Sequence, residues 1–245
     1  MKICLAQTQP QRGDVEANIT AHKRLIGLAA TNDSEIIIFP ELSLTGYEPS
    51  MAKALALTSD DHRLEGFQFL ANSHSITICL GAPIQLNEEI CIAMLIFHPN
   101  RSMQIYFKEY LHKDEEDFFV SHQNDSLLMN HYPNIALAIC YELSVSEHAE
   151  KAATSGADFY VASVAKTAGG VEKSYKRLSE IASAHQMIVL MANCVGLSEE
   201  GLCAGQSAVW NSDGIPIGQL DDSNEGLLIF DTKTQGATKI PIPVH

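Results

Sequence analysis

The sequence has little positive charge. It holds 16 lysines and arginines against 30 aspartates and glutamates, so its formal net charge is −14. A nucleic-acid backbone is bound by a basic face that displaces its counterions. No stretch of basic residues in this chain offers such a face, so we expect no nucleic-acid partner.

Long apolar runs are also missing. The longest runs have the length of a strand, which predicts that no transmembrane helix is present. The N-terminus reads MKICLAQTQPQRGD and has only a short apolar run before polar residues, too little for a secretory signal. The sequence therefore predicts neither a membrane partner nor export.

A cysteine framework is absent as well. The chain has six cysteines but no CxxC pair, and most of them lie inside strand-like runs. In a chain without an export signal, we interpret them as reduced thiols of a cytoplasmic protein. The cysteines are Cys4, Cys79, Cys91, Cys140, Cys194 and Cys203.

No Gly/Ser-rich or Pro-rich linker interrupts the chain, so we expect one domain over residues 1–245. Strand-like runs alternate with helix-like stretches, and two hairpins are expected over 90–110 and 205–220. This mixture predicts an α/β fold with sheets that are part parallel and part antiparallel. Further strands are expected over 2–9, 35–40, 75–83, 134–140, 158–165, 187–196 and 225–234, and helices over 13–33, 60–72, 146–156 and 171–185.

The segment IIIFPELSLTGYEPS places a carboxylate directly after a short apolar strand. Strand ends in α/β folds open onto the crevice that holds the site, and Glu41 follows the proline that ends this strand. A partly desolvated carboxylate has a raised pKa and is a better base near neutral pH. Taken alone, Glu41 is better explained as a solvated loop residue.

The segment QIYFKEYLHKDEE places Lys108 near the end of an apolar and aromatic strand. A lysine beside carboxylates stays protonated and can stabilise an oxyanion. Taken alone, Lys108 is better explained as a lysine that protects an edge strand from pairing. Lys113 is a weaker candidate for the same role, because it lies beyond the strand and among acids.

The segment NIALAICYELSV ends an apolar run on Cys140. A thiol at a strand end, just before a helix, can use backbone N–H groups as an oxyanion hole. A cysteine inside an apolar run is more often a small core residue. Taken alone, Cys140 is better explained as a small core side chain than as a nucleophile.

In combination, the three segments resemble the nitrilase (carbon–nitrogen hydrolase) superfamily. That family has a Glu in FPE…TGY, a Lys in Y-x-K-x-x-L and a Cys in I-C-Y-[DE], and this chain has FPELSLTGY, YFKEYL and ICYEL in the same order. The opening MKICLAQTQPQRGDVEANI and the later MANCVG and GQSAVWNSDG are similar to the family's flanks, so the likeness covers nearly the whole chain. The resemblance implies a four-layer α-β-β-α sandwich.

The resemblance also implies catalytic roles. Cys140 would be the nucleophile, Glu41 the general base and Lys108 the oxyanion stabiliser. Many members carry a further glutamate eight residues after the lysine, here Glu116, which would hold the lysine or help to position substrate and water.

Three more residues are expected to bind substrate. The backbone N–H of Tyr141 would help to hold the oxyanion, and Tyr47 would line the pocket. Glu142 is expected in the pocket because it lies close to the nucleophile. Phe107 stands where the family often has arginine, and Glu142 and Leu143 depart from its usual Asp-Arg, which leaves the substrate subgroup open.

The implied reaction is cysteine-dependent hydrolysis of a non-peptide C–N bond in a small amide, through a thioester and without a metal or cofactor. The resemblance also suggests a homodimer or a higher homo-oligomer. Nitrile hydrolysis and acyl transfer by the same residues stay open, as does a non-catalytic binding module. A metal site is a further alternative, although its spacing fits no compact ligand motif; it would use His112, His122, His131, Asp114 and Glu115.

Overall fold

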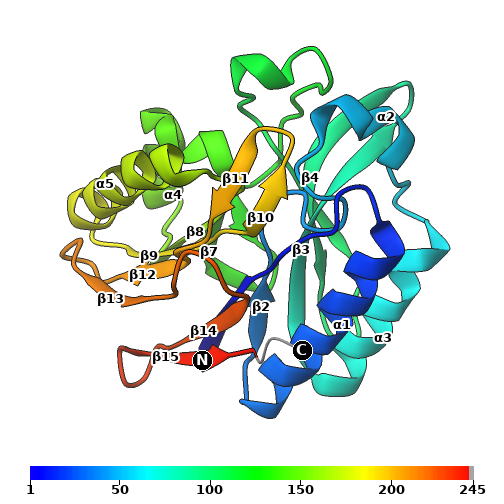
Figure 1. The fold of residues 1–245 in the computed structure, drawn as a ribbon. Helices are drawn as coiled ribbons and strands as arrows, with labels where there is room; N and C mark the ends of the chain where they lie inside the picture. The colour runs from blue at the N-terminus through cyan, green and yellow to red at the C-terminus, as the bar shows by residue number, and fades with distance from the viewer. Residues whose placement is uncertain (243–245) are drawn as a thin grey trace.

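Two β-sheets packed face to face form the centre of the computed structural model, which describes residues 1–242 (Figure 1). Both sheets are mixed: β1, β2 and β3 run parallel in the first, and β7, β8 and β9 in the second. In sheet order, the first holds β15 (Gly236–Pro241), β14 (Gly226–Asp231), β1 (Lys2–Gln7), β2 (Ile36–Ile38), β3 (Thr77–Leu86), β4 (Glu89–Phe97) and β5 (Gln104–Phe107). The second holds β13 (Pro216–Gln219), β12 (Ala208–Trp210), β9 (Ile188–Ala192), β8 (Phe159–Ser163), β7 (Tyr132–Ile139) and β6 (Leu128–Met129).

Helices cover the outer face of each sheet. Figure 1 shows α1 (Val15–Thr31) and α3 (Glu65–His74) on one side and α4 (Ser146–Thr154) and α5 (Ala168–His185) on the other. The apolar faces of α1 and α3 pack on the first sheet, and a second, larger core joins the facing sheets and continues under α4 and α5. The expected α/β fold with four layers is therefore confirmed.

Most of the expected strands and helices are present, but the region after β9 differs from the expectation. The sequence predicts one strand over 187–196, whereas β9 ends at Ala192 and a separate hairpin follows, formed by β10 (Val195–Ser198) and β11 (Gly201–Ala204). Asn193 lies at the break, where its side-chain amide donates hydrogen bonds to the carbonyl groups of Lys166 and Gly205. The strands β6 and β15 were also not expected.

The loop after β2 crosses the neighbouring strand β3 at very short range. Phe39 N–H donates to Cys79 O at 2.8 Å, and Leu44 N–H donates to Gly81 O at 3.0 Å. A Cβ atom at position 81 would overlap the backbone nitrogen of Leu42 and lie 2.6 Å from Pro40 O. Gly81 therefore permits the approach that places Glu41, which lies between these residues.

No helix within residues 1–242 combines the length and the apolar character that a bilayer span needs.

Replacing Gly81 with alanine tests this close approach. We expect Gly81→Ala to lower the free energy of unfolding by about 1–3 kcal/mol, because the added methyl group has no space and the loop must shift. Gly27→Ala is the control: position 27 lies in α1 with open space around its missing Cβ, so alanine should stabilise the helix by about 0.5–1 kcal/mol. Urea denaturation measures both, and equal effects would contradict the packing argument.

Candidate active site

A buried lysine lies between two buried carboxylates at the edge of the first sheet. Lys108 follows β5, and its Nζ atom donates to Glu41 Oε1 at 2.7 Å and to Glu115 Oε1 and Oε2 at 2.6 and 2.8 Å. The side chains of Lys108 and Glu41 are fully buried, and that of Glu115 is 2% exposed. The lysine therefore joins two segments that are far apart along the chain.

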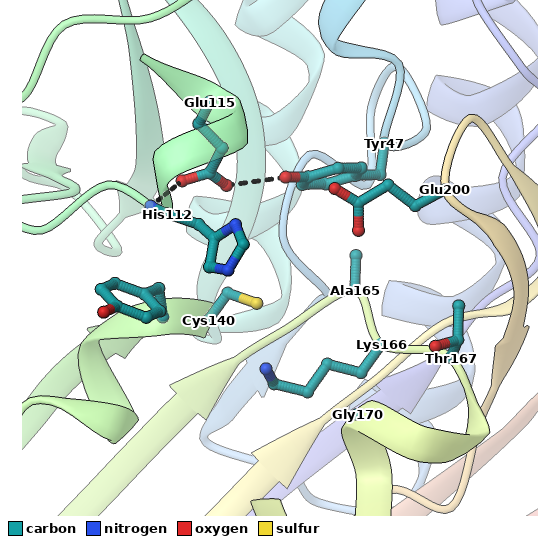
Figure 2. A pocket seen from close by; sticks show the side chains of 10 residues that line it. Tyr47, His112, Glu115, Cys140, Ala165, Lys166, Thr167, Gly170 and Glu200 are labelled. Carbon is teal, nitrogen blue, oxygen red and sulfur yellow. Dashed lines mark hydrogen bonds between the residues drawn. The ribbon is translucent and has the colours of Figure 1, made fainter. Parts of the chain in front are cut away.

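The second glutamate beside the lysine is Glu115, and the expectation of Glu116 is wrong. A 3₁₀ turn over Lys113–Glu115 points the Glu115 side chain inward, while Glu116 is exposed. Figure 2 shows the Glu115 carboxylate between the backbone N–H of His112, at 2.7 Å, and the hydroxyl of Tyr47, also at 2.7 Å. Lys113 is exposed and is not the lysine of this cluster.

Cys140 lies at the end of β7, where the strand turns into a 3₁₀ helix over Cys140–Ser144. Its backbone φ angle is +43°, in the left-handed region that residues with a Cβ atom rarely adopt. Such a conformation costs about 1–3 kcal/mol and is concentrated at functional sites. The turn presents the thiol toward Glu41, whose Oε2 atom receives no hydrogen bond from a nitrogen or oxygen donor within residues 1–242.

The charges of this cluster shift its protonation equilibria. Burial raises the pKa of Glu41 above its ordinary value, and attraction to Lys108 only partly offsets that rise. Burial and the charge of Glu41 raise the pKa of Cys140 to about 12, against the opposing charges of Lys166 and Lys108. Burial disfavours the charge on Lys108, but its anionic neighbours, Glu41 first, raise its pKa above the ordinary value. At neutral pH the thiol is therefore protonated, beside Glu41 and the ammonium group of Lys108.

A cavity of about 140 Å³ opens above the thiol. The sulfur atom of Cys140 points into it, between Lys166 on one side and Tyr47 with Glu200 on the other (Figure 2). Tyr47 and Tyr141, both expected to bind substrate, line this cavity. Lys166 and Glu200 also line it and were not anticipated from the sequence, because nothing in their own segments resembles a site.

Glu142 does not line the cavity, so its expected place in the substrate pocket is wrong. Its Oε1 atom accepts from Glu109 N–H at 2.6 Å, and its Oε2 atom accepts from Ile139 N–H at 2.7 Å and from the Tyr106 hydroxyl at 2.9 Å. His148 completes the network, with its Nε2 atom 3.0 Å from the Tyr106 hydroxyl. Burial raises the pKa of Glu142 to about 7, against the hydrogen bonds that lower it. Glu142 thus ties the turn of Cys140 to the strand end that carries Lys108.

The histidines of the alternative metal site do not converge. His112 packs against Tyr141, His122 against Phe107 and His131 against His98. Within residues 1–242, no group of three or more His, Cys, Asp or Glu side chains is arranged to hold a metal ion.

Comparison with known proteins shows the family. A family model described as carbon-nitrogen hydrolase matches residues 2–241, nearly the whole chain. The chain belongs to the carbon–nitrogen hydrolase family. The family and the enzyme class expected from the three segments are therefore confirmed.

Two curated relatives of this carbon–nitrogen hydrolase differ in length. The protein named "Hydrolase in pqqF 5'region" of Pseudomonas protegens is 25% identical over 231 residues, which cover 91% of this chain and 80% of that protein. The glutamine-dependent NAD(+) synthetase of Aquifex aeolicus is 25% identical over 229 residues, which cover 90% of this chain but only 39% of the synthetase.

Solved structures share the fold of this carbon–nitrogen hydrolase. The amidase from Nesterenkonia sp. AN1 superimposes with a TM-score of 0.84 at 22% identity, covering 94% of this chain and 92% of that chain. A mutant of the same amidase in complex with butyramide gives a TM-score of 0.84 at 21% identity, covering 96% and 92%.

Removing the Glu142 side chain tests its structural role. We expect Glu142→Ala to lower the free energy of unfolding by about 2–4 kcal/mol, because two buried backbone N–H groups lose their acceptor. Glu116→Ala is the control, and as an exposed change it should stay within about 0.5 kcal/mol of the wild type. Urea denaturation measures both variants, and an unchanged midpoint for Glu142→Ala would contradict this role.

Proposed function

We propose that this carbon–nitrogen hydrolase cleaves the C–N bond of a small amide through a thioester on Cys140. The observation that supports this function best is the buried ion cluster of Lys108, Glu41 and Glu115 beside the Cys140 thiol, of which Glu115 lines the same cavity as Cys140. A nucleophile, a base and a cation in contact are what acyl transfer through a covalent intermediate requires.

The first step follows from the protonation states. The Cys140 thiol transfers its proton to Glu41 as the sulfur attacks the amide carbon, because a free thiolate is disfavoured in this buried position. The raised pKa of Glu41 makes its carboxylate a stronger base than an ordinary glutamate. The amide oxygen gains the negative charge, and Lys108 and the backbone N–H of Tyr141 stabilise it.

The second step breaks the C–N bond. Glu41 returns the proton to the leaving nitrogen, and ammonia or an amine departs while the acyl group remains on the sulfur as a thioester. Glu41 then removes a proton from water, which attacks the thioester carbon. The carboxylic acid leaves, and the proton returns to the sulfur. Glu115 takes no proton in this sequence; it holds Lys108 in position.

Nitrile hydrolysis and acyl transfer would begin with the same groups. We favour amide hydrolysis because the solved structures of this fold include an amidase with bound butyramide. Hydroxylamine added with and without acceptor amines separates transfer of the acyl group from its hydrolysis. The homodimer, the cytoplasmic location and the single domain over residues 1–245 stay predictions of the sequence.

The first test is ammonia release from a panel of small amides and nitriles. We expect Cys140→Ala to lower the rate by about four orders of magnitude or more, because no thioester can form. Cys4→Ala is the control, since Cys4 lies in the core under the outer helices, and it should retain activity. Mass spectrometry of a trapped acyl adduct locates the nucleophile; full activity of Cys140→Ala, or an adduct on another cysteine, would contradict the assignment.

The second test compares adjacent glutamates. We expect Glu115→Gln to lower kcat by about a hundredfold, because Lys108 loses one of its two anionic partners and shifts from the oxyanion position. Glu116→Gln removes the same charge one residue later, from an exposed side chain, and should change kcat by less than about twofold. Steady-state kinetics on one amide measures both, and equal losses would show that Glu115 has no special role.

A further inference from the structure

A second lysine faces the thiol, and the mechanism above does not use it. Lys166 follows β8 and lines the cavity together with Cys140. Its side chain is half-buried, and the hydrogen bonds of Lys166 within residues 1–242 are all made by its backbone and none by its Nζ atom. Lys108, in contrast, is neutralised by two carboxylates. Lys166 is therefore a cation inside the reaction cavity whose charge is available to a bound molecule.

The backbone of Lys166 is firmly held. Lys166 N–H donates to Asn193 Oδ1 at 2.8 Å, and Asn193 Nδ2 donates back to Lys166 O at 3.1 Å. Ala204 N–H in β11 also donates to Lys166 O, at 3.0 Å. Asn193 is completely buried, so this attachment is shielded from water.

The aliphatic part of Lys166 lies along the first turn of α5. A Cβ atom at Gly170 would be 3.3 Å from Lys166 Cβ and 3.5 Å from its Cγ, so the missing side chain of Gly170 leaves room for this stem. Figure 2 shows the stem entering the cavity below Cys140. Thr167 and Gly170, which begin α5, line the same wall, and the positive end of the helix dipole adds to the charge of Lys166.

The opposite wall has the opposite charge. Glu115 and Glu200 line the cavity beside Tyr47, across the thiol from Lys166 (Figure 2). An anionic group of a bound molecule is repelled from that wall and attracted to the wall of Lys166. The two walls therefore impose one orientation on a charged substrate.

We propose that Lys166 binds a carboxylate of the substrate, and that this enzyme acts on short amides that carry a carboxylate at their other end. The inference rests on the amide hydrolysis proposed above and adds the substrate class. The cavity volume of about 140 Å³ corresponds to about five water molecules at roughly 30 Å³ each. This volume suits a chain with about two methylene groups between the amide and the carboxylate.

Two amides that differ at one end test the proposal. Succinamate has a carboxylate where butyramide has a methyl group, and kcat/KM is measured for both by ammonia release. We expect the wild type to prefer succinamate by at least about tenfold, and Lys166→Met to reduce that ratio by at least about tenfold, because the carboxylate loses its counter-charge. Lys166→Arg should retain most of the preference. Lys176→Met, an exposed change on α5, should leave the ratio unchanged.

The outcomes separate this inference from the proposed function. Cys140-dependent hydrolysis of butyramide without a preference for succinamate would overturn the role of Lys166 and leave amide hydrolysis standing. An equal loss on both amides in Lys166→Met would also overturn it, because the lysine would then act on the thiol and not on the carboxylate.

A second measurement needs no turnover. Iodoacetate and iodoacetamide alkylate the Cys140 thiol and differ only in carrying a carboxylate or an amide, and intact-mass spectrometry follows both rates. We expect Lys166→Met to lower the ratio of the iodoacetate rate to the iodoacetamide rate by about tenfold. An unchanged ratio would overturn the proposal even if neither amide is hydrolysed.

Discussion

The arrangement of this protein depends on one buried ion cluster, in which the ammonium group of Lys108 contacts Glu41 and Glu115. Removing a charge from water costs several kcal/mol, and a close opposite charge must offset that cost. Two carboxyl groups share one cation here. Burial raises the pKa of Glu41 more than the attraction of Lys108 lowers it, and burial together with the charge of Glu41 keeps the neighbouring thiol protonated. Glu41 is a stronger base than an ordinary glutamate because burial removes water from its carboxyl group.

The positions of Glu41, Lys108 and Cys140 at strand ends were predictable because each follows an apolar run of strand length. Such runs fix where a strand leaves the core, and the ends of neighbouring strands open onto one crevice. The α-β-β-α layering followed from the family resemblance, and the observed sheets and helices agree with it. Their catalytic roles belong to the proposed function and are not visible in the alternation of apolar and polar residues.

The directions in which the neighbouring charged side chains point were not predictable from the local sequence pattern. Glu115 and Glu116 are chemically identical, and only the 3₁₀ turn decides which of them reaches Lys108. Glu142 turns away from the cavity because Tyr106 and the backbone of Glu109 meet it from another strand. Lys166 faces the thiol because Asn193, 27 residues later, holds its backbone. Each of these outcomes depends on contacts between distant segments, which a single sequence does not display.

The β10–β11 hairpin places Glu200 in the wall of the cavity, while the groups that would break the bond come from other segments. Ser50 holds the turn of this hairpin, because its backbone N–H and its hydroxyl both donate hydrogen bonds to the Glu199 carboxylate. A change at Glu200 therefore alters one wall of the cavity without changing the groups proposed to break the bond.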